Sequence, residues 1–173
     1  MRAEQVLLLV TASGGAARES ARDALGGVRS SGMDAATRVL VLANRTADSS
    51  ELLRQVLARH GRSPIAVTML APAIWEVQDP HGGTESAWRR LRAAQKRLQA
   101  DGIEVSCMIG DPDPMTAFER EWKRGGYDEV IVATLPSQLS KWLRIDLPRR
   151  IRVAVAGVSI THVVASPDPL GAD

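Results

Sequence analysis

The sequence has few of the residues that redox, metal and nucleophilic chemistry require. Among 173 residues there is one cysteine, Cys107, three histidines and an aromatic fraction of 3%. A single cysteine excludes an internal disulfide and a thiolate metal site, and the histidines (His60, His81 and His162) have no metal-ligand spacing. Cys107 lies in a predicted strand, where we expect an inert buried thiol.

Long apolar runs and a strong charge of either sign are also lacking. No run approaches the ~20 residues that a membrane span needs, so we expect a cytoplasmic, soluble protein with no membrane partner. The net charge of +2 implies no partner by itself. No Ser/His/Asp arrangement and no pair of carboxylates in a predicted crevice is visible, so we expect no enzymatic activity.

Composition divides the chain into three predicted parts. Residues 1–37 form a low-complexity extension rich in Ala, Gly, Ser and Arg, residues 38–165 form one α/β domain, and residues 166–173 form a flexible tail. Within the extension, Ser13-Gly14-Gly15 is similar to the start of the pyrophosphate loop of ATP-cleaving α/β enzymes. The similarity ends at Ala17 and Arg18, where that loop has Asp and Ser, so a flexible extension remains the alternative.

Five short apolar runs, separated by helix-forming segments, predict a parallel α/β sheet. The runs are β-branched and show little alternation, which is typical of strands covered on both faces. Strand–helix alternation from residue 39 onward predicts helices on both faces. The predicted strands are Val39–Ala43, Pro64–Leu70, Ile103–Ile109, Glu129–Ala133 and Gly157–Val164.

Polar residues and prolines mark the predicted helix starts. Asp48 is the expected N-cap of the first helix, with Glu51 reaching back to it as in a capping box. Gly110-Asp111-Pro112 and the following Asp113-Pro114 predict a tight turn, a cap and a helix start. Asp146, two residues before Pro148, is the expected N-cap of the last helix. Residues 134–146 are expected to form a polar loop.

The strand pattern, the Gly110-Asp111-Pro112 turn and the spacing around Pro136 resemble the universal stress protein family. This resemblance implies a Rossmann-like sheet in the order 3-2-1-4-5 and a homodimer formed through Val158–Val164. In the family, a Gly-x-x-Gly-x9-Gly-Ser/Thr loop holds the phosphates of ATP. Those positions fall on Ala133, Pro136, Asp146 and Leu147, which offer no glycine backbone to a phosphate, so standard ATP binding is not expected.

The implied strand order brings the ends of the first and fourth strands to one crevice. Two interpretations remain open: an anion site built from hydroxyls and arginines, or a loop pinned by Trp142 and Leu143 with solvated arginines. No cofactor is required, but ATP or another adenine nucleotide is a candidate ligand. The candidate ligand-binding residues are Ala43, Asn44, Arg45, Thr46, Gly110, Thr134, Pro136, Ser137, Ser140, Arg144, Asp146 and Leu147.

The leading hypothesis is therefore a divergent universal-stress-protein-like module that regulates a stress response through association, as a dimer or with a protein partner. The alternative is a sensor of a nucleotide or phosphate ligand. An ATP-cleaving enzyme would depend on Ser13-Gly14-Gly15 alone. The arginine-rich helix face at Arg89–Arg97 is interpreted as solvated surface rather than a nucleic-acid site, because no aromatic stacking platform accompanies it.

Overall fold

The computed structural model describes residues 36–73 and 82–166, which lie in one unit, Ala35–Asp173. Residues 1–35 of the predicted extension, with Ser13-Gly14-Gly15, and residues 167–173 of the predicted tail lie outside the described residues. Five strands and five helices follow one another as β1 (Thr37–Leu42), α2 (Ser50–His60), β2 (Ile65–Pro72), α3 (Gly82–Ala100), β3 (Glu104–Gly110), α4 (Pro114–Arg124), β4 (Glu129–Thr134), α5 (Lys141–Arg144), α6 (Leu147–Ala154) and β5 (Ser159–Val164).

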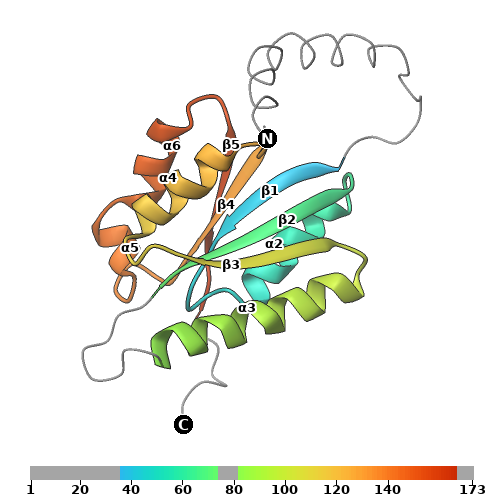
Figure 1. The fold of residues 1–173 in the computed structure, drawn as a ribbon, viewed down its shortest axis with the longest axis horizontal. Coiled ribbons are helices and arrows are strands. Elements are labelled where there is room, and N and C mark those ends of the chain that lie inside the picture. Colours follow the sequence, from blue (N-terminus) through green and yellow to red (C-terminus); the bar gives the residue numbers. More distant parts are fainter. Residues whose placement is uncertain (1–35, 74–81, 167–173) are drawn as a thin grey trace, which may run out of the picture. The chain divides into compact units, whose positions relative to one another are not determined.

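The strands form one parallel sheet in the order β3-β2-β1-β4-β5, as predicted (Figure 1). Each predicted strand is present, with bounds that differ from the prediction by at most two residues. The central strand β1 is paired on both sides: Val41 lies opposite Met69 of β2 and Ile131 of β4. The carboxyl ends of β1 and β4 are therefore neighbours, and the strand order reverses between them.

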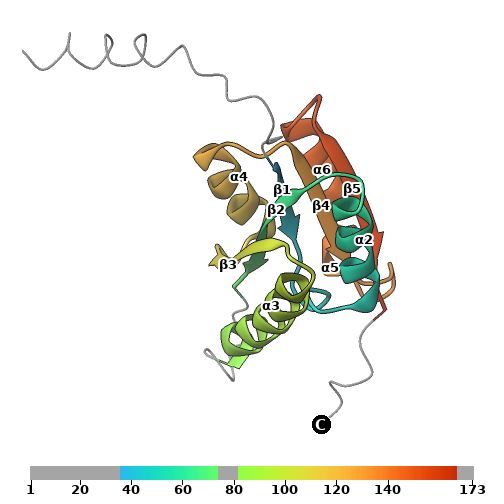
Figure 2. The same cartoon turned by 90° about the vertical axis from the view of Figure 1, so that its right-hand side faces the viewer.

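Helices cover both faces of the sheet (Figures 1 and 2), because alternate residues of each central strand point to opposite sides. Val39 and Val41 of β1 pack in a core with α2 and α3, while Leu40 and Leu42 pack in a second core with α4 and α6. All four side chains are fully buried. The apolar, non-alternating sequence of β1 follows from this double coverage.

The first helix is capped by Ser49 and not by Asp48, so the predicted capping box is wrong. The Ser49 hydroxyl accepts a hydrogen bond from the Leu52 N–H (3.3 Å). Glu51 is then the second helical residue rather than the third, so it is misplaced for the reciprocal bond of a capping box. The prediction for α4 is confirmed: Asp113 accepts from the Thr116 N–H (2.7 Å), and Pro114 opens the helix.

The connection after β4 contains α5, a single helical turn that the sequence analysis treated as loop. The Ser140 hydroxyl caps it by accepting from the Leu143 N–H. Asp146 occupies the N-cap position of α6 but makes no side-chain cap bond, because its backbone is left-handed, with φ 52° and ψ 37°. Its predicted capping role is therefore wrong. Leu147, Ile151 and Val155 face the core, as their spacing predicts.

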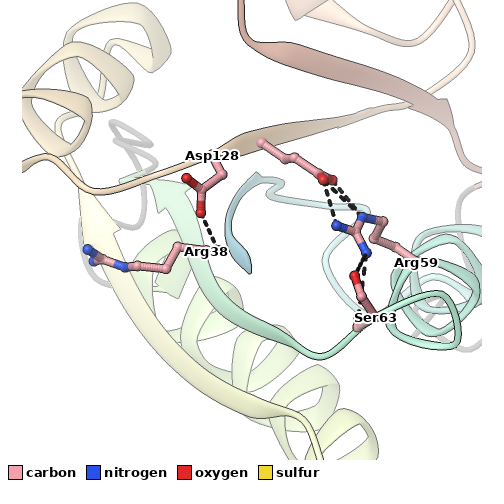
Figure 3. Close-up of polar contacts among 5 residues, drawn as sticks. Arg38, Arg59, Ser63 and Asp128 are labelled. Carbon is pink, nitrogen blue, oxygen red and sulfur yellow. Dashed lines mark hydrogen bonds and ion pairs between the residues drawn. The ribbon is translucent and has the colours of Figure 1, made fainter. Parts of the chain in front are cut away.

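Polar contacts fasten the amino end of the sheet, opposite the crevice. Arg59, at the end of α2, forms a bidentate pair with Glu129 at the start of β4, with distances of 2.7–3.0 Å, and also donates to the Ser63 hydroxyl (2.9 Å). The Arg38 backbone N–H donates to the Asp128 carboxylate (2.8 Å) (Figure 3). The bidentate geometry of Arg59 and Glu129 constrains the relative orientation of the two side chains, so this ion pair fixes α2 against β4.

No helix in residues 36–73 and 82–166 has both the length and the apolar character required to cross a lipid bilayer.

Candidate functional site

A pocket of about 400 Å³ lies at the carboxyl ends of β1, β2 and β4. Three segments line it: the loop after β1, the turn after β2 with Pro112, and the connection from β4 through α5. This is the place where open parallel sheets bind ligands, and its volume lies in the range of small-molecule pockets. The lining residues are Asn44, Arg45, Thr46, Pro72, Ala73, Pro112, Ala133, Thr134, Leu135, Leu139, Ser140, Lys141 and Trp142.

Five of the twelve candidate residues come together in this pocket: Asn44, Arg45, Thr46, Thr134 and Ser140. The other seven are not among its lining residues: Ala43, Gly110, Pro136, Ser137, Arg144, Asp146 and Leu147. Ala43 and Leu147 are buried in the two cores. Ser137, Arg144 and Asp146 are exposed on the connection after β4. The pocket therefore lies at the ends of the predicted strands, but the loop residues that line it differ from the predicted ones.

Gly110 serves packing and does not line the pocket. A Cβ atom at this position would lie 2.8 Å from the Cβ of Ala117 and 2.9 Å from Cδ1 of Leu70. Both distances are shorter than van der Waals contact, so only glycine lets α4 approach the sheet this closely. The Gly-Asp-Pro turn is explained here by helix–sheet packing.

The sequence analysis missed the wall that β2 contributes. Pro72 and Ala73 line the pocket beside Asn44, and Pro112 completes this side. None of these residues has a polar side chain, so no chemical signal marked them. The implied order 3-2-1-4-5 was the available signal, since it makes β2 the neighbour of β1 on the side away from β4. Lys141 and Trp142, from the connection after β4, also line the pocket.

The three hydroxyls of the pocket already have protein partners. The Thr46 hydroxyl donates to the Ala133 carbonyl oxygen (3.1 Å), and the Thr134 hydroxyl is bonded to Nε2 of His162 (2.8 Å). The Ser140 oxygen accepts from Leu143 as the α5 cap. Because a capping oxygen keeps its own hydrogen, Ser140 retains a hydroxyl proton that these bonds do not use. Thr134 does so as well only when Nε2 of His162 is the protonated ring nitrogen. An anion in the pocket is therefore limited to few hydroxyl donors.

Asn44 has a buried acceptor with no hydrogen-bond partner among the described residues. Its amide nitrogen donates to the Pro72 carbonyl oxygen (3.1 Å), which fixes the amide orientation. The other atom of the amide, Oδ1, is buried and unpaired. An unsatisfied buried acceptor costs about 1–3 kcal/mol, so this position favours a ligand that donates a hydrogen bond.

The charge of the pocket wall is positive. Arg45 and Lys141 line it, and no carboxylate does so within the described chain. Two cations, one free hydroxyl proton and one unpaired acceptor suit a ligand that has both a donor edge and an anionic group. The apolar wall, which includes Leu135, Leu139 and Trp142, suits a planar or aliphatic body.

The backbone at the expected phosphate-loop positions is committed to other contacts. The Pro136 carbonyl accepts from the N–H groups of both Leu139 (2.8 Å) and Ser140 (2.9 Å), which closes a tight turn. Leu147 is buried in the core and Asp146 places a carboxylate before α6. These features leave no glycine-lined cradle for a triphosphate in the described connection between β4 and α6.

Cys107 lies apart from this pocket and has the character of an inert thiol. Its Sγ lies 3.6 Å from the Leu91 carbonyl oxygen, and burial raises the pKa of the thiol to about 11. The thiolate is therefore scarce near neutral pH. No cluster of three or more His, Cys, Asp or Glu side chains with metal-binding geometry occurs in the parts of the chain that are described.

The fold and the position of the crevice define an α/β protein with the universal stress protein fold. Among solved structures, the chain is similar to a universal stress protein in complex with cAMP. The TM-score is 0.51 at 16% sequence identity, and the match covers 77% of this chain and 100% of the other. No protein-family model and no curated protein sequence matches the chain.

Proposed function

We propose that this protein is a universal-stress-protein-like regulatory module of the stress response that acts by association and not by catalysis. The observation that carries the proposal is the state of the phosphate-loop positions. Ala133 and Leu147 are buried, and Asp146 introduces a negative charge. The Pro136 carbonyl oxygen closes a tight turn by accepting from the N–H groups of Leu139 and Ser140. A module that keeps the fold and has lost this cradle has no means of holding ATP in the family's way.

Association is proposed to use the free side of β5. Within the described residues this strand pairs with β4 on one side only, and an edge strand presents unpaired backbone groups to another copy. Val164 at its end is 50% exposed, which adds apolar area to that edge. Antiparallel pairing of β5 with β5 of a second copy, or packing between the two strands, would bury this area.

Light scattering after size-exclusion chromatography tests this arrangement. We expect a dimer at micromolar concentration and a monomer for Val164→Lys, because the lysine places a solvated charge in the contact. Val153→Lys is the matched control, since Val153 is equally apolar and is exposed on α6, and it should remain dimeric. A strictly monomeric wild-type protein would contradict association through β5.

The second candidate function is a sensor of a small nucleotide, and the unpaired Asn44 acceptor favours it. An amino or hydroxyl edge of a nucleoside would satisfy Oδ1, and Lys141 with the Ser140 hydroxyl would meet a single phosphate. The similar solved structure is a complex with cAMP, a ligand with one phosphate. ATP or AMP would use the same nucleoside contacts.

Calorimetric titration with AMP and with cAMP tests the sensor. We expect Asn44→Leu and Lys141→Ala each to weaken binding about tenfold, which corresponds to the loss of one hydrogen bond to a charged or buried group. Arg144→Ala removes the same charge from α5 outside the pocket lining, so it should bind like the wild type. An equal loss of nucleotide affinity in Lys141→Ala and Arg144→Ala would show that the pocket is not the binding site.

A further inference from the structure

The surface formed by residues 139–153 combines exposed apolar side chains with a concentration of positive charge. Of the four large apolar side chains that are exposed in the described chain, three belong to it: Leu139 (56% exposed), Ile145 (42%) and Val153 (75%). The same segment carries five cations against one acid, Asp146. The cations are Lys141, Arg144, Arg149, Arg150 and Arg152, and all five are exposed.

Most of this charge has no ion-pair partner. Arg149 is the one cation of the five that forms an ion pair within the described chain, with Asp146 at 3.6 Å, and its side chain is still 79% exposed. By contrast, Arg59 is bound to Glu129, and Arg120 to Asp111 at 2.8 Å. Residues 139–153 therefore place a net positive charge next to exposed apolar side chains.

The elements of this surface lie together in space. Helices α5 and α6 pack against each other and follow one another along the same side of the sheet (Figures 1 and 2). Leu147 and Ile151 of α6 pack into the core with Val155, and Pro148 is also buried. The exposed residues of the helix include Arg149, Arg150, Arg152 and Val153. Leu139 joins the surface from the connection before α5, at the rim of the pocket.

We propose that the surface of residues 139–153 binds the headgroup region of anionic lipid membranes. Clusters of four to eight lysines and arginines on helical segments are attracted to acidic lipids. Exposed aliphatic side chains make binding more favourable when they enter the membrane interface. The expectation of no membrane partner rested on the lack of a long apolar run, a criterion that concerns spanning helices. A contact at the surface requires no such run.

The composition of the surface favours a bilayer over a nucleic acid. A nucleic-acid backbone supplies phosphates but no apolar layer for Leu139, Ile145 and Val153. Single-stranded binding relies on exposed aromatic rings for stacking. The one aromatic residue of the segment, Trp142, packs against a core and lines the pocket, so it does not form such a platform.

Vesicle co-sedimentation with the full chain tests the proposal. The probes are phosphatidylcholine vesicles with and without phosphatidylglycerol, at low and at high salt. We expect binding to the anionic vesicles alone, and loss of binding at high salt because the charges are screened. Each cation near an anionic bilayer raises partitioning about fivefold, so Arg149→Gln with Arg152→Gln should weaken binding about 25-fold.

Two further variants separate this surface from charge in general. Lys96→Gln with Arg97→Gln removes the same charge from exposed positions of α3, on the opposite face of the sheet, and should leave vesicle binding unchanged. Leu139→Ser with Val153→Ser keeps the charge and should weaken binding roughly tenfold, since these exposed side chains enter the interface in part. All four positions are exposed, so the variants should fold.

The proposal is overturned by absence of binding to anionic vesicles at low salt, or by equal weakening in the α3 variant. It is also overturned if the Leu139 and Val153 substitutions have no effect, since the contact would then be one of charge alone. Tighter binding to a short duplex DNA than to anionic vesicles, with the same dependence on Arg149 and Arg152, would assign the surface to nucleic acid instead.

Discussion

At the scale of single residues, close packing constrains Gly110 and backbone conformation constrains Asp146. Gly110 ends β3 under the first turn of α4, where a side chain would meet Ala117 and Leu70 at less than 3.0 Å. Asp146 has a positive φ in the connection before α6, a conformation that glycine adopts at no steric cost. Glycine is the residue that both positions accommodate with least strain, but only position 110 is a glycine.

Gly110→Ala should lower the unfolding free energy by about 1–3 kcal/mol, because an added methyl group overpacks the contact between α4 and the sheet. Chemical denaturation measures this change. Gly61→Ala is the matched control: its φ is −62°, its nearest neighbours lie at 3.6 Å or more, and the substitution should be neutral or stabilising. An unchanged stability for Gly110→Ala would show that α4 shifts without cost.

Asp146 gives a second prediction at this scale. Asp146→Ala should be less stable than Asp146→Gly by about 1 kcal/mol, because alanine pays the steric cost of the left-handed conformation and glycine does not. Both variants lose the exposed contact with Arg149, so that contact cancels in the comparison. Denaturation curves of the two variants measure the difference. Equal stability would mean that the connection relaxes out of the left-handed conformation.

At the scale of elements, the bond between Thr134 and His162 joins the pocket to the edge strand. Thr134 is at the end of β4 and lines the pocket, and His162 is on β5, 2.8 Å away. Burial, and secondarily the charge of Arg152, lowers the pKa of His162 below its ordinary value of 6.5. The neutral ring is therefore the form that the folded protein favours.

This shift predicts a pH dependence of stability. Between the lowered pKa and 6.5, the unfolded chain binds more protons at His162 than the folded protein does. The unfolding free energy should therefore fall as the pH drops from about 6.5 toward the lowered value. Denaturation at a series of pH values measures the slope, and His162→Gln should flatten it. The same slope in the variant and in the wild type would assign it to other groups.

The elements show which features a sequence can predict. The five strands were predictable because burial on both faces leaves continuous apolar runs, such as Val39–Leu42. Helix α4 was predictable because Asp113 and Pro114 define its start locally. Helix α5 was not, since a four-residue turn between Pro136 and Pro148 has no periodicity to read. The cap of α2 was misassigned because Asp48 and Ser49 are adjacent and both are good caps.

The pocket was predictable in part for the same physical reason. Asn44 and Thr46 lie in the short loop after β1 and Thr134 ends β4, so the strand order brings them together. Arg144 was placed in the crevice by its charge, but the turn of α5 puts Lys141 at the lining and leaves Arg144 outside it. Side-chain direction within a short turn depends on tertiary packing. Sequence spacing does not determine it.

At the scale of the whole molecule, the chain combines the universal stress protein fold with a pocket whose described phosphate-loop positions lack glycine. The parallel sheet in the order β3-β2-β1-β4-β5 is that of a universal stress protein, and the crevice at the switch point persists as a pocket of about 400 Å³. The described connection between β4 and α6 has no glycine-lined cradle for a triphosphate, because the positions that would form it hold core side chains, a closed turn and a carboxylate. The remaining cations, Arg45 and Lys141, suit at most a small anion.

The central claim is therefore that the second and third phosphates of ATP make no stabilising contact with this protein. Isothermal titration of the wild-type chain with ATP and magnesium, beside AMP, tests it most directly. We predict that ATP gives no saturable heat, or binds no more tightly than AMP, because the backbone that would hold the outer phosphates is absent or occupied. Micromolar ATP binding that is at least about tenfold tighter than AMP binding, equal to about 1.4 kcal/mol, would contradict the account.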